Sequence, residues 1–137
     1  MAYSHFYAKF YTGLTRFSRN FSQFIKFPPA IIYLAIIVIL QILNWWQAWT
    51  IFKRLTGDFL ILHYNVDFGI DLLGRSKDIF YFPILGLIIV LMNILLAFIF
   101  FRRPKGRLLM HLLLSATIIF SVFVNAALFV LFLINFR

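Results

Sequence analysis

Three long apolar runs, separated by polar segments, dominate the pattern of hydrophobic and polar positions along the chain. They cover residues 30–52, 80–101 and 108–136. Each run exceeds the roughly 18 apolar residues that mark a spanning helix, and each can cross about 30 Å of hydrocarbon. Helices satisfy their own backbone hydrogen bonds in lipid. The pattern therefore predicts an all-α membrane protein whose three transmembrane helices form one domain, residues 30–137.

Residues 1–29 show a different pattern, in which aromatic and aliphatic side chains are interleaved with cations at helical spacing. The aromatic set falls within a sector of about 100° and the cations fall on the opposite side. These cations are Lys9, Arg16, Arg19 and Lys26. The pattern predicts an amphipathic helix lying in a membrane interface, and Pro28 and Pro29 would end it and start the first span. A disordered basic flank and a mitochondrial targeting sequence are the alternatives.

Composition excludes a water-soluble domain, because 64% of the residues are hydrophobic and 12% are charged, against about 45–50% apolar and about 25% charged in soluble domains. The net charge of +9 would favour nucleic acid in a soluble protein. Here the cations flank apolar runs, so we expect anionic lipid of the inner leaflet as partner, and no nucleic acid. The headgroup candidates are Lys9, Arg16, Arg19, Lys26, Arg102, Arg103, Lys105 and Arg107.

The distribution of charge also predicts how the chain crosses the membrane. The N-terminal segment and the 102–107 link carry cations and no acid, whereas segment 53–78 balances four cations against four acids. The positive-inside rule places the N-terminus and the link in the cytoplasm, with segment 53–79 and the C-terminus outside. Pro104 and Gly106 predict a tight turn, so the second and third helices should pack antiparallel. Near its end, the first predicted helix carries an interfacial aromatic belt formed by Trp45, Trp46 and Trp49.

Polar residues inside the spans are amides and hydroxyls, and no acid, Lys or Arg lies in the body of any run. That absence argues against a proton relay, an ion pump or a charge-coupled transporter. The candidate interhelical contacts are Gln41, Asn44, Gln47, Asn93, Thr117 and Asn125. A rise of about 1.5 Å per residue places Gln41, Asn93 and Thr117 at one depth and Gln47 near Asn125. We expect Asn93 to face the other helices, and hydrogen bonds between helices rather than a polar pocket.

The segment between the first two runs concentrates the polar and charged residues. Residues 60–71 have extended-chain character, with a turn at Asp67-Phe68-Gly69 and a second break at Gly74. The segment should form a small extracytoplasmic cap between the first two spans.

His63, Asp67 and Asp71 in this segment could ligate a metal or form an acid and base pair. A lone histidine beside amides and acids is more often a hydrogen-bonding fixture, and catalytic zinc generally takes three protein ligands. With no cysteine and no nucleotide or metalloprotease motif, we expect no metal, no cofactor and no enzymatic activity. The candidate ligand contacts are His63, Asn65, Asp67, Gly69, Asp71, Gly74 and Lys77.

A family resemblance rests on the residues of this segment and the start of the next run. They are His63-Tyr64-Asn65, Gly69, Asp71, Gly74, Ser76-Lys77 and Pro83. The segment resembles a bacterial membrane domain with the pattern His-Phe-Asn, Gly, Asp, Gly-Ser-Lys and then a proline-started helix. Gly69 stands one position later than in that pattern, and Arg75 separates Gly74 from Ser76. The domain occurs in the SdpI-like immunity proteins, which protect a cell from a secreted toxin, and the resemblance covers about residues 30–100.

The resemblance implies a protein of the bacterial envelope. Together with the residue pattern, it leads us to expect a non-enzymatic integral protein of the bacterial cytoplasmic (inner) membrane. Its external segment, residues 55–78, would bind a peptide, protein or envelope ligand, as an immunity-like protein does. The alternative function is a small structural subunit of a larger membrane complex, and the alternative location is the mitochondrial inner membrane.

Overall fold

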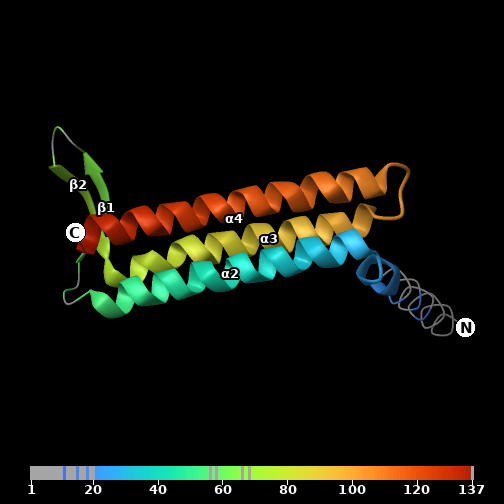
Figure 1. Ribbon diagram of the computed structural model, residues 1–137, viewed down its shortest axis with the longest axis horizontal. Helices are drawn as coiled ribbons and strands as arrows, with labels where there is room; N and C mark the ends of the chain where they lie inside the picture. Colours follow the sequence, from blue (N-terminus) through green and yellow to red (C-terminus); the bar gives the residue numbers. More distant parts are fainter. Residues whose placement is uncertain are drawn as a thin grey trace, which may run out of the picture.

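A computed structural model of the chain describes residues 11, 15, 18, 21–55, 57, 59–65, 67 and 69–136. Its elements, in chain order, are α2 (Pro28–Arg54), β1 (Phe59–Asn65), β2 (Gly69–Arg75), the short 3-10 helix η1 (Ser76–Phe80), α3 (Tyr81–Phe100) and α4 (Gly106–Phe136). The three long helices lie side by side, with the strands and the C-terminal end of α4 at one end and residues 21–27 at the other (Figure 1).

All three long helices are apolar and long enough to cross a membrane, as the three apolar runs predict. α2 extends the predicted span by two residues at each end, and α4 begins two residues earlier than predicted. Proline occupies the first turn of α2, where no intrahelical N–H bond is lost. Lys53 and Arg54 occupy its last turn, where positive charge interacts favourably with the helix dipole.

Two clusters of buried side chains hold the helices together, one toward each end of the bundle. The cluster near the N-terminal segment contains Phe24, Ala30, Ile37, Val90, Ala97, Met110 and Leu114. The cluster near the strands contains Ala48, Ile51, Leu60, Ile79, Val124, Leu128 and Leu131. α4 packs extensively against both α2 and α3, which contact each other less. α4 is therefore the central element of the bundle.

The last residues before α2 dock onto the end of α3. Residues 21–25 are helical, and Phe24 is buried, with its ring centroid 6.0 Å from Phe98 and 5.4 Å from Phe101. The Arg102 guanidinium donates hydrogen bonds to Gln23 Oε1. This part of the predicted amphipathic helix thus contacts protein. Lys26 is exposed, whereas Lys9, Arg16 and Arg19 lie outside the described residues.

A tight turn joins α3 to α4, so these two helices form the predicted antiparallel hairpin. The Arg103 amide donates to Phe100 O at 2.9 Å, and the Gly106 amide donates to Arg103 O at 2.7 Å. Lys105 adopts the left-handed conformation, with φ of 63°. A Cβ atom at position 106 would lie 2.1 Å from Phe100 O. Only glycine therefore fits at the first residue of α4.

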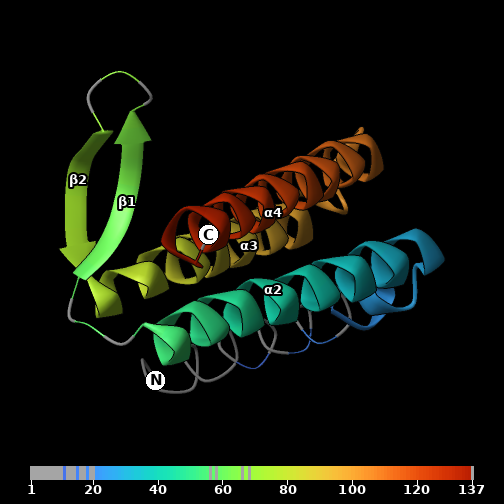
Figure 2. The same cartoon turned by 60° about the vertical axis from the view of Figure 1, so that its left-hand side comes forward.

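The cap is an antiparallel β-hairpin, in which Leu60 lies opposite Gly74 and Asn65 lies opposite Gly69. Figures 1 and 2 show the hairpin leaving the end of the bundle at a steep angle to the helices. Gly69 has φ of 78° just after the turn at Asp67, a conformation that glycine adopts without strain. The register is irregular between Ile61 and Tyr64.

The prediction of a break at Gly74 is wrong, because Gly74 lies within β2. A Cβ atom there would lie 2.6 Å from Leu62 Cδ1, so the glycine lets the Leu62 side chain cross the strand. The strand ends at Arg75 instead. There the Arg75 amide donates to Asp78 Oδ2 at 2.7 Å, and this bond caps η1.

Candidate functional site

The hairpin is fixed to the bundle by the side chain of Asn135, in the last turns of α4. The Ile61 amide donates to Asn135 Oδ1 at 2.9 Å, and Asn135 Nδ2 donates to Ile61 O at 3.0 Å. One amide side chain thus pairs with both backbone groups of a β1 residue, as a neighbouring strand would. Asn135 was not among the predicted contacts, although a single amide near the end of an apolar run is a detectable signal.

Apolar contacts at the base of the hairpin add to this bond. Leu60 of β1 and Ile79 of η1 are fully buried, in one cluster with Ile51 of α2 and Leu128 of α4. A two-stranded hairpin alone is marginally stable in water and needs packing against another element. The ends of the helices supply that packing, so the bundle holds the hairpin in a defined position.

The predicted ligand contacts divide into two groups along the hairpin. His63 and Asp67 are exposed in its outer half, where Gly69 also lies. Gly74 and Lys77 lie at its base. The side chains of Asn65 and Asp71 lie outside the part of the chain that the structure describes. The described contacts therefore do not converge on a single pocket.

An open cavity of about 610 Å³ lies at the base of the hairpin. Its lining residues are Phe52, Leu55, Gly57, Phe59, Arg75, Ser76 and Lys77. The Ser76 hydroxyl donates to Gly57 O at 3.0 Å. This bond joins the segment that precedes β1 to the start of η1, which follows β2. Of the predicted contacts, Lys77 lines this cavity. Within the described ranges, no three His, Asp or Glu side chains gather as metal ligands.

Apolar side chains are exposed along the hairpin. Phe59 is 71% exposed and Leu72 is 53% exposed, and Ile70 and Leu73 are also exposed. Among the described residues, the sheet has two strands, and no third strand pairs with the outer edge of β2. An open edge with free N–H and C=O groups is a template for an added strand. The hairpin can therefore receive an extended peptide.

Inside the bundle, the structure brings together two of the predicted polar pairs. Asn93 Nδ2 donates to Thr117 Oγ1 at 3.0 Å, so Asn93 faces α4, and Gln47 Nε2 donates to Asn125 Oδ1 at 3.4 Å. Asn44 is fully buried, and its Nδ2 lies 3.4 Å from Ser121 O. These bonds join α4 to both other helices.

The predicted depth of Gln41 is wrong, because its side chain does not meet Asn93 or Thr117. Gln41 Nε2 donates to Pro83 O at 3.0 Å, in the first turn of α3. The amide lies over Gly86, which is about two helical turns from Asn93. Counting residues from the helix ends assumes that the two helices are level, whereas the packing of α2 against α3 places the Gln41 amide beside the first turns of α3.

Four buried polar atoms have no hydrogen-bond partner among the described residues. They are Gln41 Oε1, Asn44 Oδ1, Gln47 Oε1 and Ser121 Oγ. All four lie on α2 or α4, in the same row as the bonded amides. These four oxygen atoms can therefore accept further hydrogen bonds.

We predict that the Asn93–Thr117 bond contributes a modest free energy to the bundle. In a double-mutant cycle, Asn93→Leu and Thr117→Val should show a coupling of about 0.6 kcal/mol in the free energy of unfolding, a typical value for such bonds. Reversible unfolding in mixed micelles would measure it. Asn93→Leu combined with Asn125→Leu is the control and should be additive. Additivity in the first pair would show that the bond contributes nothing.

A second polar cluster lies near the other end of the bundle and was not predicted from the sequence. The Ser115 hydroxyl donates to Tyr33 Oη at 3.1 Å, and His111 Nδ1 lies 3.4 Å from the same oxygen. Tyr33 lies within an apolar run, where its hydroxyl needs a partner. The cluster joins α2 to α4.

Three spanning helices with a hairpin at one end define the class of the chain, a multi-pass membrane protein. Comparisons with protein-family models, with curated proteins and with solved structures found no significant match.

Proposed function

We propose that this chain is a non-enzymatic recognition protein of the bacterial inner membrane, whose hairpin binds an extended segment of a peptide or protein on the extracytoplasmic side. One observation carries the proposal: the hairpin is fixed to the helix ends through Asn135 and Leu60, yet it leaves the β2 edge open. A binding surface that is already ordered loses little conformational entropy when it binds.

The side chains of the hairpin suit such a ligand. Main-chain hydrogen bonds to β2 would supply affinity, and exposed Ile70, Leu72 and Leu73 would contact alternate side chains of the added strand. Exposed polar side chains lie at the two ends of the hairpin, and they would contact polar or charged groups of the ligand. They are His63, Asp67 and Lys77. The resemblance to SdpI-like immunity proteins is part of this proposal, because those proteins counter a secreted toxin.

The proposed orientation rests on the charges at the two ends of the bundle. Arg102, Arg103, Lys105 and Arg107 are cations of the α3–α4 link, at the end opposite the hairpin, and all four acids of the chain belong to segment 53–78. The positive-inside rule then puts the link in the cytoplasm and the hairpin outside.

A charge placed on the β2 edge should test the proposal. We predict that Leu72→Asp lowers recovery of a hairpin partner at least about tenfold, because burying an unpaired carboxylate in the interface costs well over the 1.4 kcal/mol that tenfold represents. The measurement is affinity capture of the tagged protein from native membranes in mild detergent, followed by quantitative mass spectrometry.

Tyr81→Asp is the matched control, because Tyr81 is also an exposed large side chain but lies in the first turn of α3, outside the hairpin. It should leave the capture unchanged. If no partner shows a selective loss with Leu72→Asp, the recognition proposal is wrong.

The second candidate is a structural subunit of a larger membrane complex. A groove of about 200 Å³ between α2 and α4 favours it. Trp46, 71% exposed, lines this groove beside Gln47, whose Oε1 has no hydrogen-bond partner within the part of the chain that the structure describes. A neighbouring helix could fill the groove and donate a hydrogen bond to that oxygen. Stoichiometric partners that both aspartate variants retain, and that Trp46→Ala loses, would establish this function.

A further inference from the structure

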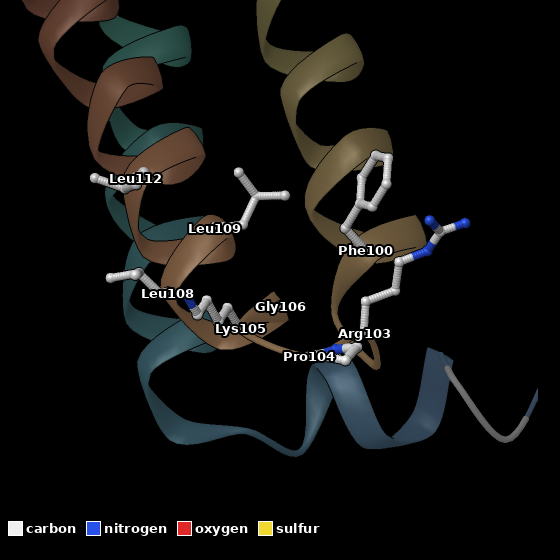
Figure 3. Close-up of a pocket in the computed structure, with 8 residues that line it drawn as sticks. All are labelled: Phe100, Arg103, Pro104, Lys105, Gly106, Leu108, Leu109 and Leu112. Carbon is white, nitrogen blue, oxygen red and sulfur yellow. The ribbon is translucent and has the colours of Figure 1, made fainter.

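An open groove lies between the end of α3 and the start of α4 (Figure 3), at the end of the bundle away from the hairpin (Figure 1). Its volume is about 310 Å³. Its apolar lining comes from Phe100 of α3 and from Leu108, Leu109 and Leu112 of α4; Leu109 lies between the two helices, and Leu108 and Leu112 lie on the outer side of α4 (Figure 3). The body of the groove is therefore apolar and follows the direction of the helices.

Cations line the end of the groove at the link. Arg103 and Lys105 are exposed lining residues, and Arg103 Cζ lies 5.0 Å from the centroid of the Phe100 ring. Arg102 and Arg107 flank them, and the four acids of the chain all belong to segment 53–78, at the hairpin end. With no acid nearby to neutralise these cations, this end attracts anions.

Backbone donors lie beside the same cations. The Leu109 amide donates to Lys105 O at 3.1 Å, whereas the amides of Arg107 and Leu108 have no backbone acceptor among the described residues. The first N–H groups of a helix are unpaired, and the helix dipole makes that end favourable for an anion. A bound anion would therefore meet both side-chain charge and main-chain donors.

We propose that this groove is a binding site for one anionic phospholipid of the leaflet at the α3–α4 link. Its phosphate lies at Lys105 and the first amides of α4, with Arg103 adding positive charge from across the link, and an acyl chain lies along the apolar residues of the groove, among them Leu109 and Leu112. Charge complementarity at one end and an apolar trough along the helices match both parts of that molecule. The proposal rests on the spanning helices and is independent of what the hairpin binds.

Native mass spectrometry of the purified protein in a neutral detergent would test the site. The probes are phosphatidylglycerol and phosphatidylcholine with identical acyl chains, and the first should bind more tightly. The variant Arg103→Gln with Lys105→Gln should weaken phosphatidylglycerol binding roughly thirtyfold, as expected for two basic residues, and leave phosphatidylcholine nearly unchanged.

The matched control is Lys53→Gln with Arg54→Gln, which removes the same charge from the opposite end of the bundle and should have little effect. Leu109→Trp should fill the groove and weaken both lipids, whereas Leu91→Trp, on an exposed position of α3, should not. Equal losses for the two charge pairs would overturn the site. So would displacement of the lipid by inorganic phosphate alone, or a groove covered by a second copy of the chain and revealed as a Leu109→Cys disulfide dimer.

Discussion

Gly106→Ala should destabilise the bundle by about 4 kcal/mol or more, at the extreme of single-substitution effects. The added Cβ would lie 2.1 Å from Phe100 O and 2.6 Å from Phe101 O. Both atoms belong to the backbone of the turn, so no side-chain rotation relieves the contact. The turn must open, and α3 and α4 then lose their register. Reversible unfolding in mixed micelles, followed by circular dichroism, would measure the loss.

Gly86→Ala provides the matched control within the membrane span. The nearest atoms to a Cβ at Gly86 belong to the Gln41 amide, at 3.5 and 3.6 Å, which is ordinary van der Waals contact. Alanine is the better helix former by about 1 kcal/mol, so this variant should be neutral or slightly more stable. Similar losses for the two variants would contradict the role assigned to the turn.

Asn135→Leu should release the hairpin while leaving the helices folded. The substitution removes both hydrogen bonds to Ile61 and leaves a partly buried N–H and C=O without partners. Each unsatisfied group costs about 1–3 kcal/mol. Amide hydrogen exchange in β1 should therefore become about tenfold to a thousandfold faster, since 1.4 kcal/mol corresponds to a factor of ten. Hydrogen–deuterium exchange with mass spectrometry would report it.

Asn125→Leu serves as the control for this variant. It removes an amide from the same helix, but that amide bonds Gln47 inside the span and makes no hydrogen bond with a described residue of the hairpin. Exchange in β1 should be unchanged. If Asn135→Leu also leaves β1 protected, the apolar contacts of Leu60 alone hold the hairpin.

The sequence allowed the spanning helices and the link to be predicted because these depend on local signals. Long apolar runs suffice for the helices, and Pro104 with Gly106 suffices for the turn. Two polar pairs could also be predicted, since α2 and α4 place Gln47 and Asn125 at one level.

Features that depend on tertiary packing could not be predicted in the same way. Gln41 bonds Pro83 O because the packing of α2 against α3 brings its amide to the first turns of α3, which residue counting cannot show. Glycine is typical of turns, yet Gly74 lies in a strand, where the absence of a side chain leaves room for Leu62. The role of Asn135 depends on β1 passing the end of a helix 74 residues away in sequence.

The bond between Asn135 and Ile61 sets an order of events in biogenesis. Asn135 follows Ile61 by 74 residues, so β1 leaves the ribosome long before its anchor is synthesised. The hairpin can reach its final position only after the third span has been inserted with the correct topology. A molecule that has not completed insertion of α4 therefore lacks the Asn135 anchor, and its hairpin is not held against the helix ends.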